Sequence, residues 1–346
     1  MRAAFAHLDL GIGGAERLVV NLALGLHLEG HEVHLYTTHH SQGHSFSETK
    51  KEGGVLGNVV YTYGDWLPRQ ILGRFTALCS ILRLLYLSLY VITFYWMDHF
   101  DVVVLDGVSA PLPLLWIFGV PTLFYCHYPD KLLCTNRTSL VKKLYRFFID
   151  GLEDMSICCA HGVVCNSKFT TSKVEASFPL LSRTHTTQVL YPPVDDIPVE
   201  VANTSTYPCY LPQDENEDLN IFFVSLNRFE RKKDIELSIR AMEVLRREKE
   251  TCPVLARVKL VVAGGYDTCV AENVEYKAEL EALVRELGLS VGEDIIFRTS
   301  VSDAERTSLL VYATALLYTP ANEHFGIVPL ESMLLGTPVV AVNSGG

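Results

Sequence analysis

The chain has 346 residues, 49% of them hydrophobic, and a formal net charge of −11. This length is long for one domain and suits two, each with a core of its own. The acidic balance disfavours a nucleic-acid partner, because binding to phosphate backbones relies on basic surfaces. The nine cysteines include no C-x-x-C pair, which indicates a reduced, cytosolic setting and not a disulfide framework.

The first predicted elements are a strand, a glycine-rich turn and a helix. An apolar run leads into the Gly11–Gly14 turn, and apolar residues at helical spacing follow from Leu18. Such a turn is a common cradle for phosphate groups. The glycines do not match GxGxxG, and no ribose-binding acid is clear about 20 residues later, so the motif alone is weak. We take Gly13 and Gly14 as candidate phosphate-binding residues.

The next predicted helix lies in a stretch without acidic residues, 66–97. Its apolar run, Leu84–Trp96, is shorter than the roughly 20 residues that span a bilayer, and Arg83 blocks extension backward. An interfacial helix with aromatic anchors and a buried core helix both fit this pattern.

A second acid-free stretch covers 131–149. Lys142, Lys143 and Arg146 alternate there with leucines and phenylalanines. A basic amphipathic helix of this kind is typical of contact with a membrane surface. The first half of the chain is therefore predicted to face anionic lipid or a lipid diphosphate.

Polar residues follow several predicted strands. His127 comes after the strand 120–126, and the turn with Arg228 and Lys233 follows the buried strand 221–224. The carboxyl ends of parallel strands are where α/β folds bind ligands, so His127 is a site candidate. Arg228 and Lys233 can clamp a diphosphate, although a solvated basic turn fits the residues equally well.

The second half repeats the strand and glycine pattern. Gly264 and Gly265 end an apolar strand at 258–263, and the apolar strand 338–342 also leads into glycines. Helices are predicted at 236–249, 273–287 and 303–312. Apolar strands that end in glycine turns in both halves predict parallel sheets.

The most informative segment is Asn322–Glu331, in which Glu323 and Glu331 are eight positions apart. It predicts a loop and then a helix whose first turn holds Pro329. The backbone N–H groups around Phe325, Gly326 and Ile327, at the helix start, suit a diphosphate, and the carboxylates suit sugar hydroxyls. Four apolar residues predict a buried helix face: Leu330, Met333, Leu334 and Leu335.

The domain boundaries follow from these elements. Residues 1–190 form a predicted first α/β domain, the proline-marked 191–219 a linker, and 220–346 a second α/β domain. No metal site is indicated, because no Asp-x-Asp follows a strand. The histidines 39, 40 and 44 are predicted in a loop without matching ligands.

Together, the motifs GIGGAER, FYCHYPD, NRFERKK, LVVAGGYD and EHFGIVPLE resemble the retaining GT-B glycosyltransferases of the GT4 group. The resemblance implies two Rossmann-like α/β domains that face each other across a cleft. The runs HLDLGIGGAERLV, GDWLPR and NEHFGIVPLE are similar to those of mannosyltransferases of the dolichol-linked oligosaccharide pathway. Members continue past NSGG, so the second domain is expected to be incomplete. The chain alone is therefore expected to be poorly soluble and inactive.

The resemblance also implies an activity. Mannose would pass from GDP-mannose, with retention, to dolichyl-diphosphate-linked Man-GlcNAc2, first α-1,3 and then α-1,6, in N-glycan precursor assembly. The expected place is the cytosolic face of the endoplasmic reticulum membrane. The expected partners are the nucleotide-sugar, the lipid-linked oligosaccharide, the membrane surface and other glycosyltransferases of the pathway. No cofactor is implied.

The same resemblance implies residue roles. Glu323 would meet the mannose hydroxyls and Glu331 the ribose. His127 and the Gly13–Gly14 turn would face the sugar and diphosphate from the other domain. Arg228 and Lys233 would stabilise charge on the departing diphosphate.

Two alternatives stay open from the sequence. One is a catalytically inactive donor-binding protein that accompanies an enzyme at the membrane. The other is a Rossmann dinucleotide oxidoreductase, which the incomplete glycine fingerprint and the paired acids disfavour.

Overall fold

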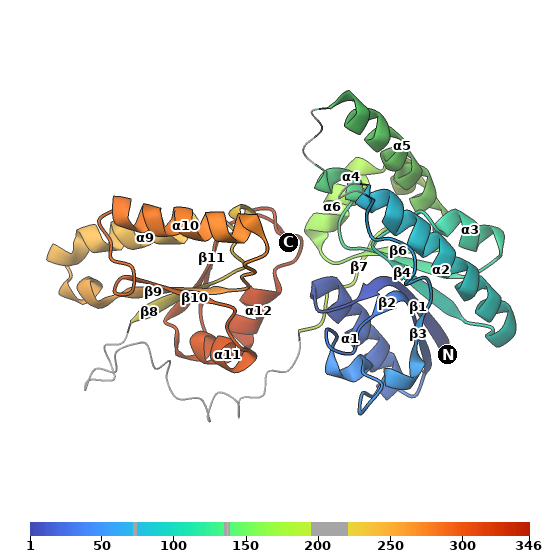
Figure 1. Cartoon of the computed structure of the whole chain (residues 1–346), viewed down its shortest axis with the longest axis horizontal. Coiled ribbons are helices and arrows are strands. Elements are labelled where there is room, and N and C mark those ends of the chain that lie inside the picture. The colour runs from blue at the N-terminus through green and yellow to red at the C-terminus, as the bar shows by residue number, and fades with distance from the viewer. Residues whose placement is uncertain (72–74, 135–136, 138, 195–220) are drawn as a thin grey trace. The chain divides into compact units, whose positions relative to one another are not determined.

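The computed structural model describes residues 1–71, 75–134, 137, 139–194 and 221–346 (Figure 1). The chain divides into two compact units, Met1–Pro193 and Val194–Gly346, and each is described by itself. The predicted first domain ends at residue 190, close to this division. Most of the predicted linker lies outside the described residues.

The first unit is built on a seven-stranded parallel sheet in the order β3-β2-β1-β4-β5-β6-β7. The strand order reverses between β1 and β4, and such a reversal is where open α/β sheets bind ligands. The strands are β1 (Arg2–Leu10), β2 (Glu32–His40), β3 (Val60–Thr62), β4 (Val102–Asp106), β5 (Thr122–Cys126), β6 (Gly162–Cys165) and β7 (Gln188–Val189).

Helices cover both faces of this sheet. Alternate residues of β1 point to opposite faces, so Phe5 packs with α1 while Ala4 and Ala6 pack with α2 and α3. The helices are α1 (Gly14–Leu28), α2 (Thr76–Asp98), α3 (Leu112–Ile117), α4 (Asp130–Leu133), α5 (Leu140–Ser156), α6 (Lys168–Ser177) and α7 (Pro179–Thr184).

The second unit has a five-stranded parallel sheet in the order β10-β9-β8-β11-β12, which reverses between β8 and β11. Helices α9 and α10 lie on one face, and α11 and α12 lie on the other (Figure 1). The strands are β8 (Phe222–Leu226), β9 (Lys259–Gly264), β10 (Ile295–Thr299), β11 (Ala315–Tyr318) and β12 (Val339–Ala341). The helices are α9 (Ile235–Arg247), α10 (Ala271–Glu286), α11 (Asp303–Tyr312) and α12 (Ile327–Leu334).

Helix α2 is longer than the apolar run that predicts it. It continues back through Arg83 to Thr76, so the expectation that Arg83 stops the apolar helix is wrong. The Arg83 side chain is buried against Asp9, which neutralises its charge inside the unit. By length and composition alone α2 could cross a membrane, and it is the single such helix in the described part of the chain. Its inner face, with Leu84, Leu87 and Val91, is core, whereas Trp96 is exposed.

Two further predictions need correction. His39 and His40 end strand β2 and do not lie in a loop; His44 follows the strand. On α12, Met333 and Leu334 are exposed, whereas Ser332 is the residue that the helix buries. The apolar spacing shows that a helix forms, but it does not set which side of the helix meets the sheet.

Helix α5 carries the predicted basic amphipathic pattern, with one exception. Arg146 is buried, and its guanidinium pairs with Asp130 at 2.9 Å and with Asp150 at 2.6 Å. The prediction that Arg146 lies on the lipid-facing side is therefore wrong. Lys142 and Lys143 are exposed. So are seven large apolar residues of the helix: Leu140, Val141, Leu144, Phe147, Phe148, Leu152 and Met155.

Candidate active site

At the strand-order reversal of the first unit, one buried carboxylate holds two histidines. Asp106 ends β4, and its two oxygens lie 2.6 Å from Nδ1 of His7 on β1 and 2.9 Å from Nε2 of His127 after β5. His7 and Asp106 are buried, whereas His127 is partly exposed. Because the carboxylate accepts from Nε2–H of His127, the Nδ1 atom of that ring is the one left for another partner.

Electrostatics fixes the charge of this cluster. Burial alone would lower the pKa of His7, but the charge and hydrogen bond of Asp106, together with Glu16, raise it to about 10. Burial alone would raise the pKa of Asp106, but His7 and His127 hold it well below its usual range. An imidazolium and a carboxylate therefore sit together at neutral pH, and the pair orients His127.

This raised pKa predicts a pH dependence of stability. A histidine whose folded pKa lies above its unfolded value of about 6.5 stabilises the fold fully below that value, and the contribution is lost as the pH rises through about 10. We expect the free energy of unfolding of the first unit to fall between pH 7 and pH 10. In His7→Asn this fall should be smaller. Urea titrations at three pH values measure both slopes, and equal slopes would contradict the assignment.

The glycine turn lies beside this cluster. Gly13 precedes α1 in an extended conformation, and the Glu16 carboxylate folds back over it, 2.3 Å from where a Cβ would stand. A Cβ on Gly14 would meet nothing within 4 Å. No internal packing at Gly14 thus requires a glycine, and the space above it is open to a ligand.

In the second unit, Lys233 and Glu323 meet at the strand-order reversal. The loop after β8 carries Lys233 and the loop after β11 carries Glu323, and Nζ lies 2.5 Å from the carboxylate oxygen. Thr319 donates to the carbonyl oxygen of Lys233 at 2.8 Å. The turn after β12 contacts the loop that carries Glu323, because the Gly346 N–H donates to the carbonyl oxygen of Glu323 at 2.9 Å. Two sequence-predicted residues, 90 positions apart, are thus in contact.

Gly264 and Gly265 lie where β9 ends against the loop after β8. A Cβ on Gly264 would stand 2.0 Å from the carbonyl oxygen of Asn227, and its φ of +147° also favours glycine. A Cβ on Gly265 would stand 3.1 Å from Cγ of Arg228. These glycines therefore let the loop after β8 approach the end of β9 closely. Arg228 itself is exposed and pairs with Glu230 at 3.2 Å.

The start of α12 is shaped for an anion. Gly326 is its N-cap with φ of +78°, a conformation that glycine adopts without strain, and Ile327 is the first helical residue. The free N–H groups that this start presents can bind a phosphate. Phe325 and the partly buried Glu331 flank them, and the Glu331 carboxylate pairs with Arg306 of α11.

Comparison with known proteins connects these features to a family. Residues 12–196 match the model described as Glycosyltransferase Family 4, and residues 212–346 match Glycosyl transferases group 1. An alpha-1,3/1,6-mannosyltransferase ALG2 of Rhizomucor pusillus is 45% identical over 100% of this chain and 77% of its own length. The ALG2 protein of Homo sapiens is 42% identical over 99% of this chain and 79% of its own length. The ALG2 protein of Saccharomyces cerevisiae is 43% identical over 99% of this chain and 69% of its own length.

The chain belongs to the α-1,3/1,6-mannosyltransferase family. The predicted enzyme class is thereby confirmed.

Solved structures support the fold of this mannosyltransferase. Sucrose-phosphate synthase of Thermosynechococcus elongatus superposes with a TM-score of 0.64 at 19% identity, over 100% of this chain and 82% of that one. The glycosyltransferase WaaG gives 0.61 at 15% identity, over 99% and 82%. The prediction of GT-B architecture, with two parallel-sheet α/β domains, is confirmed.

Sequence reasoning missed several residues of the candidate site. Asp106 ends the apolar run of β4, so the rule that selected His127 applies to it equally. His7 and Glu16 gave no such signal, because they become significant only through their contact with Asp106. Arg306 was also missed, because it stands on a helix far from Glu331 in sequence.

Proposed function

We propose that this mannosyltransferase transfers mannose from GDP-mannose, with retention, to dolichyl-diphosphate-linked Man-GlcNAc2. It would form the α-1,3 and then the α-1,6 linkage of the N-glycan precursor. The observation that carries the donor half is the contact of Lys233 with Glu323 ahead of the α12 N-terminus. It places a cation, a carboxylate and free N–H groups on neighbouring loops, as a sugar diphosphate requires.

The proposed chemistry needs no protein nucleophile. The acceptor hydroxyl attacks the anomeric carbon from the side of the leaving group, and the bond from that carbon to the diphosphate oxygen breaks. The hydroxyl proton passes to the departing phosphate. Lys233, Arg228 and the N–H groups at Phe325–Ile327 stabilise the charge that builds on the diphosphate. Glu323 holds the mannose hydroxyls, and Glu331, oriented by Arg306, holds the ribose.

The first unit supplies the acceptor side. It also contributes to donor binding: His127, oriented by Asp106, is proposed to meet the donor sugar, and the open space above Gly14 to admit the donor diphosphate. The proposed location is the cytosolic face of the endoplasmic reticulum membrane, with other glycosyltransferases of the pathway as partners. We assign no metal or cofactor to the reaction.

The decisive experiment is transfer of labelled mannose to a lipid-linked Man-GlcNAc2 acceptor in the presence of EDTA, with this chain and with one extended past Gly346. GDP-mannose should give two successive products, and UDP-glucose and NAD should give none. Calorimetric binding of GDP-mannose without any transfer would favour the alternative of an inactive donor-binding partner. Absence of both binding and transfer would contradict the proposal.

Helix α5 is the proposed membrane contact. Its exposed phenylalanines and leucines beside Lys142 and Lys143 suit an anionic lipid surface, because apolar insertion and charge attraction act together. Charge reversal of both lysines to glutamate should reduce sedimentation with anionic vesicles at low salt. The control reverses Lys50 and Lys51, which adjoin each other elsewhere in the same unit. An equal loss in both variants would show only an effect of net charge.

A further inference from the structure

The first unit contains a cavity of about 350 Å³ that the donor and histidine sites do not use. Its walls are the start of α2, the segment after β4 from Gly107 to Ala110, helix α4, and the middle of α5. This volume is at the lower end of the range of small-molecule sites, roughly 300–1,000 Å³. Gly107, one of the lining residues, directly follows Asp106 in the chain.

The lining of the cavity favours an apolar ligand. Its carboxylates are engaged: Glu153 accepts the N–H groups of Asp130 and Lys131 at 2.7 and 2.9 Å, and Asp130 pairs with Arg146. Ser109 lies 2.7 Å from the hydroxyl of Ser156. A sugar pocket needs donors and acceptors that face the ligand, and most of the polar groups here face each other.

The electrostatics of Glu153 fits a wall of low polarity. Burial raises the pKa of this carboxyl to about 7, although its two backbone N–H donors act to lower it. The apolar surroundings therefore outweigh two hydrogen bonds. A charged ligand group would find little stabilisation there.

The cavity and a second hollow of about 560 Å³ share one lining residue, Leu152 of α5. Three exposed apolar residues of α5 also line the second hollow: Phe147, Phe148 and Met155. Its other walls include four charged residues, Arg137, Lys143, Asp150 and Asp154. The mostly apolar cavity is therefore next, through Leu152, to the amphipathic outer face of α5.

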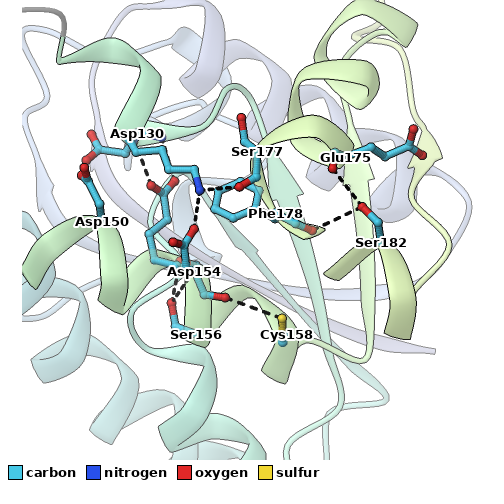
Figure 2. A network of polar contacts seen from close by, with 12 residues as sticks. Asp130, Asp150, Asp154, Ser156, Cys158, Glu175, Ser177, Phe178 and Ser182 are labelled. Carbon is cyan, nitrogen blue, oxygen red and sulfur yellow. Dashed lines mark hydrogen bonds and ion pairs between the residues drawn. The ribbon is translucent and has the colours of Figure 1, made fainter. Parts of the chain in front are cut away.

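The walls are fixed by contacts between elements and not by the ligand. The Lys131 amine of α4 donates to the carboxylate of Asp154 on α5. It also donates to the carbonyl oxygen of Ser177, at 2.5 Å, and it lies 4.1 Å from the ring centre of Phe178. Figure 2 shows Asp154, Ser177 and Phe178 gathered at this point, with Asp130 and Asp150 nearby. Binding to walls already in place loses little conformational entropy.

From this geometry we infer that the cavity binds the first isoprenoid units of the acceptor lipid, those next to its diphosphate. A polyisoprenyl chain is apolar, and the cavity offers it walls whose polar groups are mostly engaged with each other. The rest of the chain leaves past Leu152 toward the membrane that α5 contacts. This inference rests on the proposed lipid-linked acceptor, and it names the part of the protein that selects the lipid.

Photo-cross-linking tests the site without any transfer reaction. The probe is a polyisoprenyl diphosphate that carries a diazirine in its second isoprene unit and no glycan. Mass spectrometry of the labelled full chain should find adducts in the segments 76–81, 107–110 and 149–153. Adducts confined to Phe147, Phe148 and Met155 would reduce the finding to adsorption at the outer face and overturn the inference. No adduct at all would also overturn it.

A cavity-filling variant tests the consequence for selectivity. Ser80→Phe narrows the cavity from α2, and Thr93→Phe is the control on an exposed position of the same helix. With the isoprenoid-linked acceptor, KM of Ser80→Phe should rise roughly 10-fold, because a few CH2 groups lose their burial. With a water-soluble acceptor that bears the same glycan on a short alkyl chain, KM should be unchanged.

The two proposals fail in different ways. If neither acceptor receives mannose even from the unaltered chain extended past Gly346, the proposed function is wrong, while cross-linking still reports on the cavity. If transfer is normal but Ser80→Phe raises KM for both acceptors equally, the cavity does not hold the lipid. If KM rises for neither acceptor, the cavity is not used.

Discussion

Replacing Lys233 by alanine should lower kcat roughly 10²- to 10³-fold, the usual effect of removing one donor that stabilises a developing charge. Lys233 is largely buried and contacts Glu323 at 2.5 Å, so its amine stands at the loops where the strand order reverses. Donor affinity should fall much less than kcat, because the diphosphate gains most of its negative charge as the sugar bond breaks. Mannose transfer under saturating donor measures the loss.

The neighbouring residue gives a matched control for this change. Lys232 has the same charge, but its side chain is mostly exposed and pairs with Glu230 and not with Glu323. Lys232→Ala should therefore leave kcat nearly unchanged. Glu323→Gln should keep most donor binding and slow transfer, because it loses charge but keeps a hydrogen-bonding group. Similar rates for Lys233→Ala and the unaltered chain would show that the basic turn is only a solvated loop.

The largest effect on stability is expected at Arg83. Its guanidinium is 2% exposed and donates to both oxygens of Asp9, at 2.5 and 3.1 Å. Arg83→Met keeps the bulk of the side chain but leaves the carboxylate without its main partner. We expect the free energy of unfolding of the first unit to fall by about 3 kcal/mol. This loss is near the lower end of the range for removing one partner of a buried ion pair, because Asp9 is partly exposed.

Arg69 supplies the comparison, because it approaches the same carboxylate from the surface. Its Nε lies 3.9 Å from Asp9 and its side chain is 57% exposed, so Arg69→Met should cost less than about 1 kcal/mol. Hydrogen exchange of the β1 amides in the full chain reads the opening of this unit separately from the other. Equal losses in the two variants would contradict the assignment of Arg83 as the main partner. Recovery in Arg83→Met/Asp9→Leu would support it.

The sequence by itself determined the class of fold, and it selected most of the candidate donor residues. Apolar strands bounded by glycines identify parallel sheets, and residues just after such strands lie at the ligand-binding edge. His127 and Lys233 were selected in this way, since the rule needs only local pattern, whereas Glu323 was selected from the loop that precedes a predicted helix. Helix α11 was predicted with the bounds that the structure has, and α9 and α10 within two residues. Local periodicity fixes such elements because it reflects one buried face.

Only the tertiary structure decided which residues meet. The contact of Lys233 with Glu323 follows from the strand order, which places the carboxyl ends of β8 and β11 side by side. The sequence does not show that order, because a parallel strand can pair with any other. The same reason hid His7, whose imidazolium exists only because folding buries it against Asp106.

Burial of charged residues was decided in the same way. Arg83 and Arg146 stand in basic, acid-free stretches, and local composition placed them at a surface. The fold instead pairs them with acids distant in sequence, Asp9 and Asp130, and a paired charge can be buried at acceptable cost. Composition records which charges a segment carries. It does not record which partners the fold brings to them, and the cavity between α2, α4 and α5 likewise exists only in the packed structure.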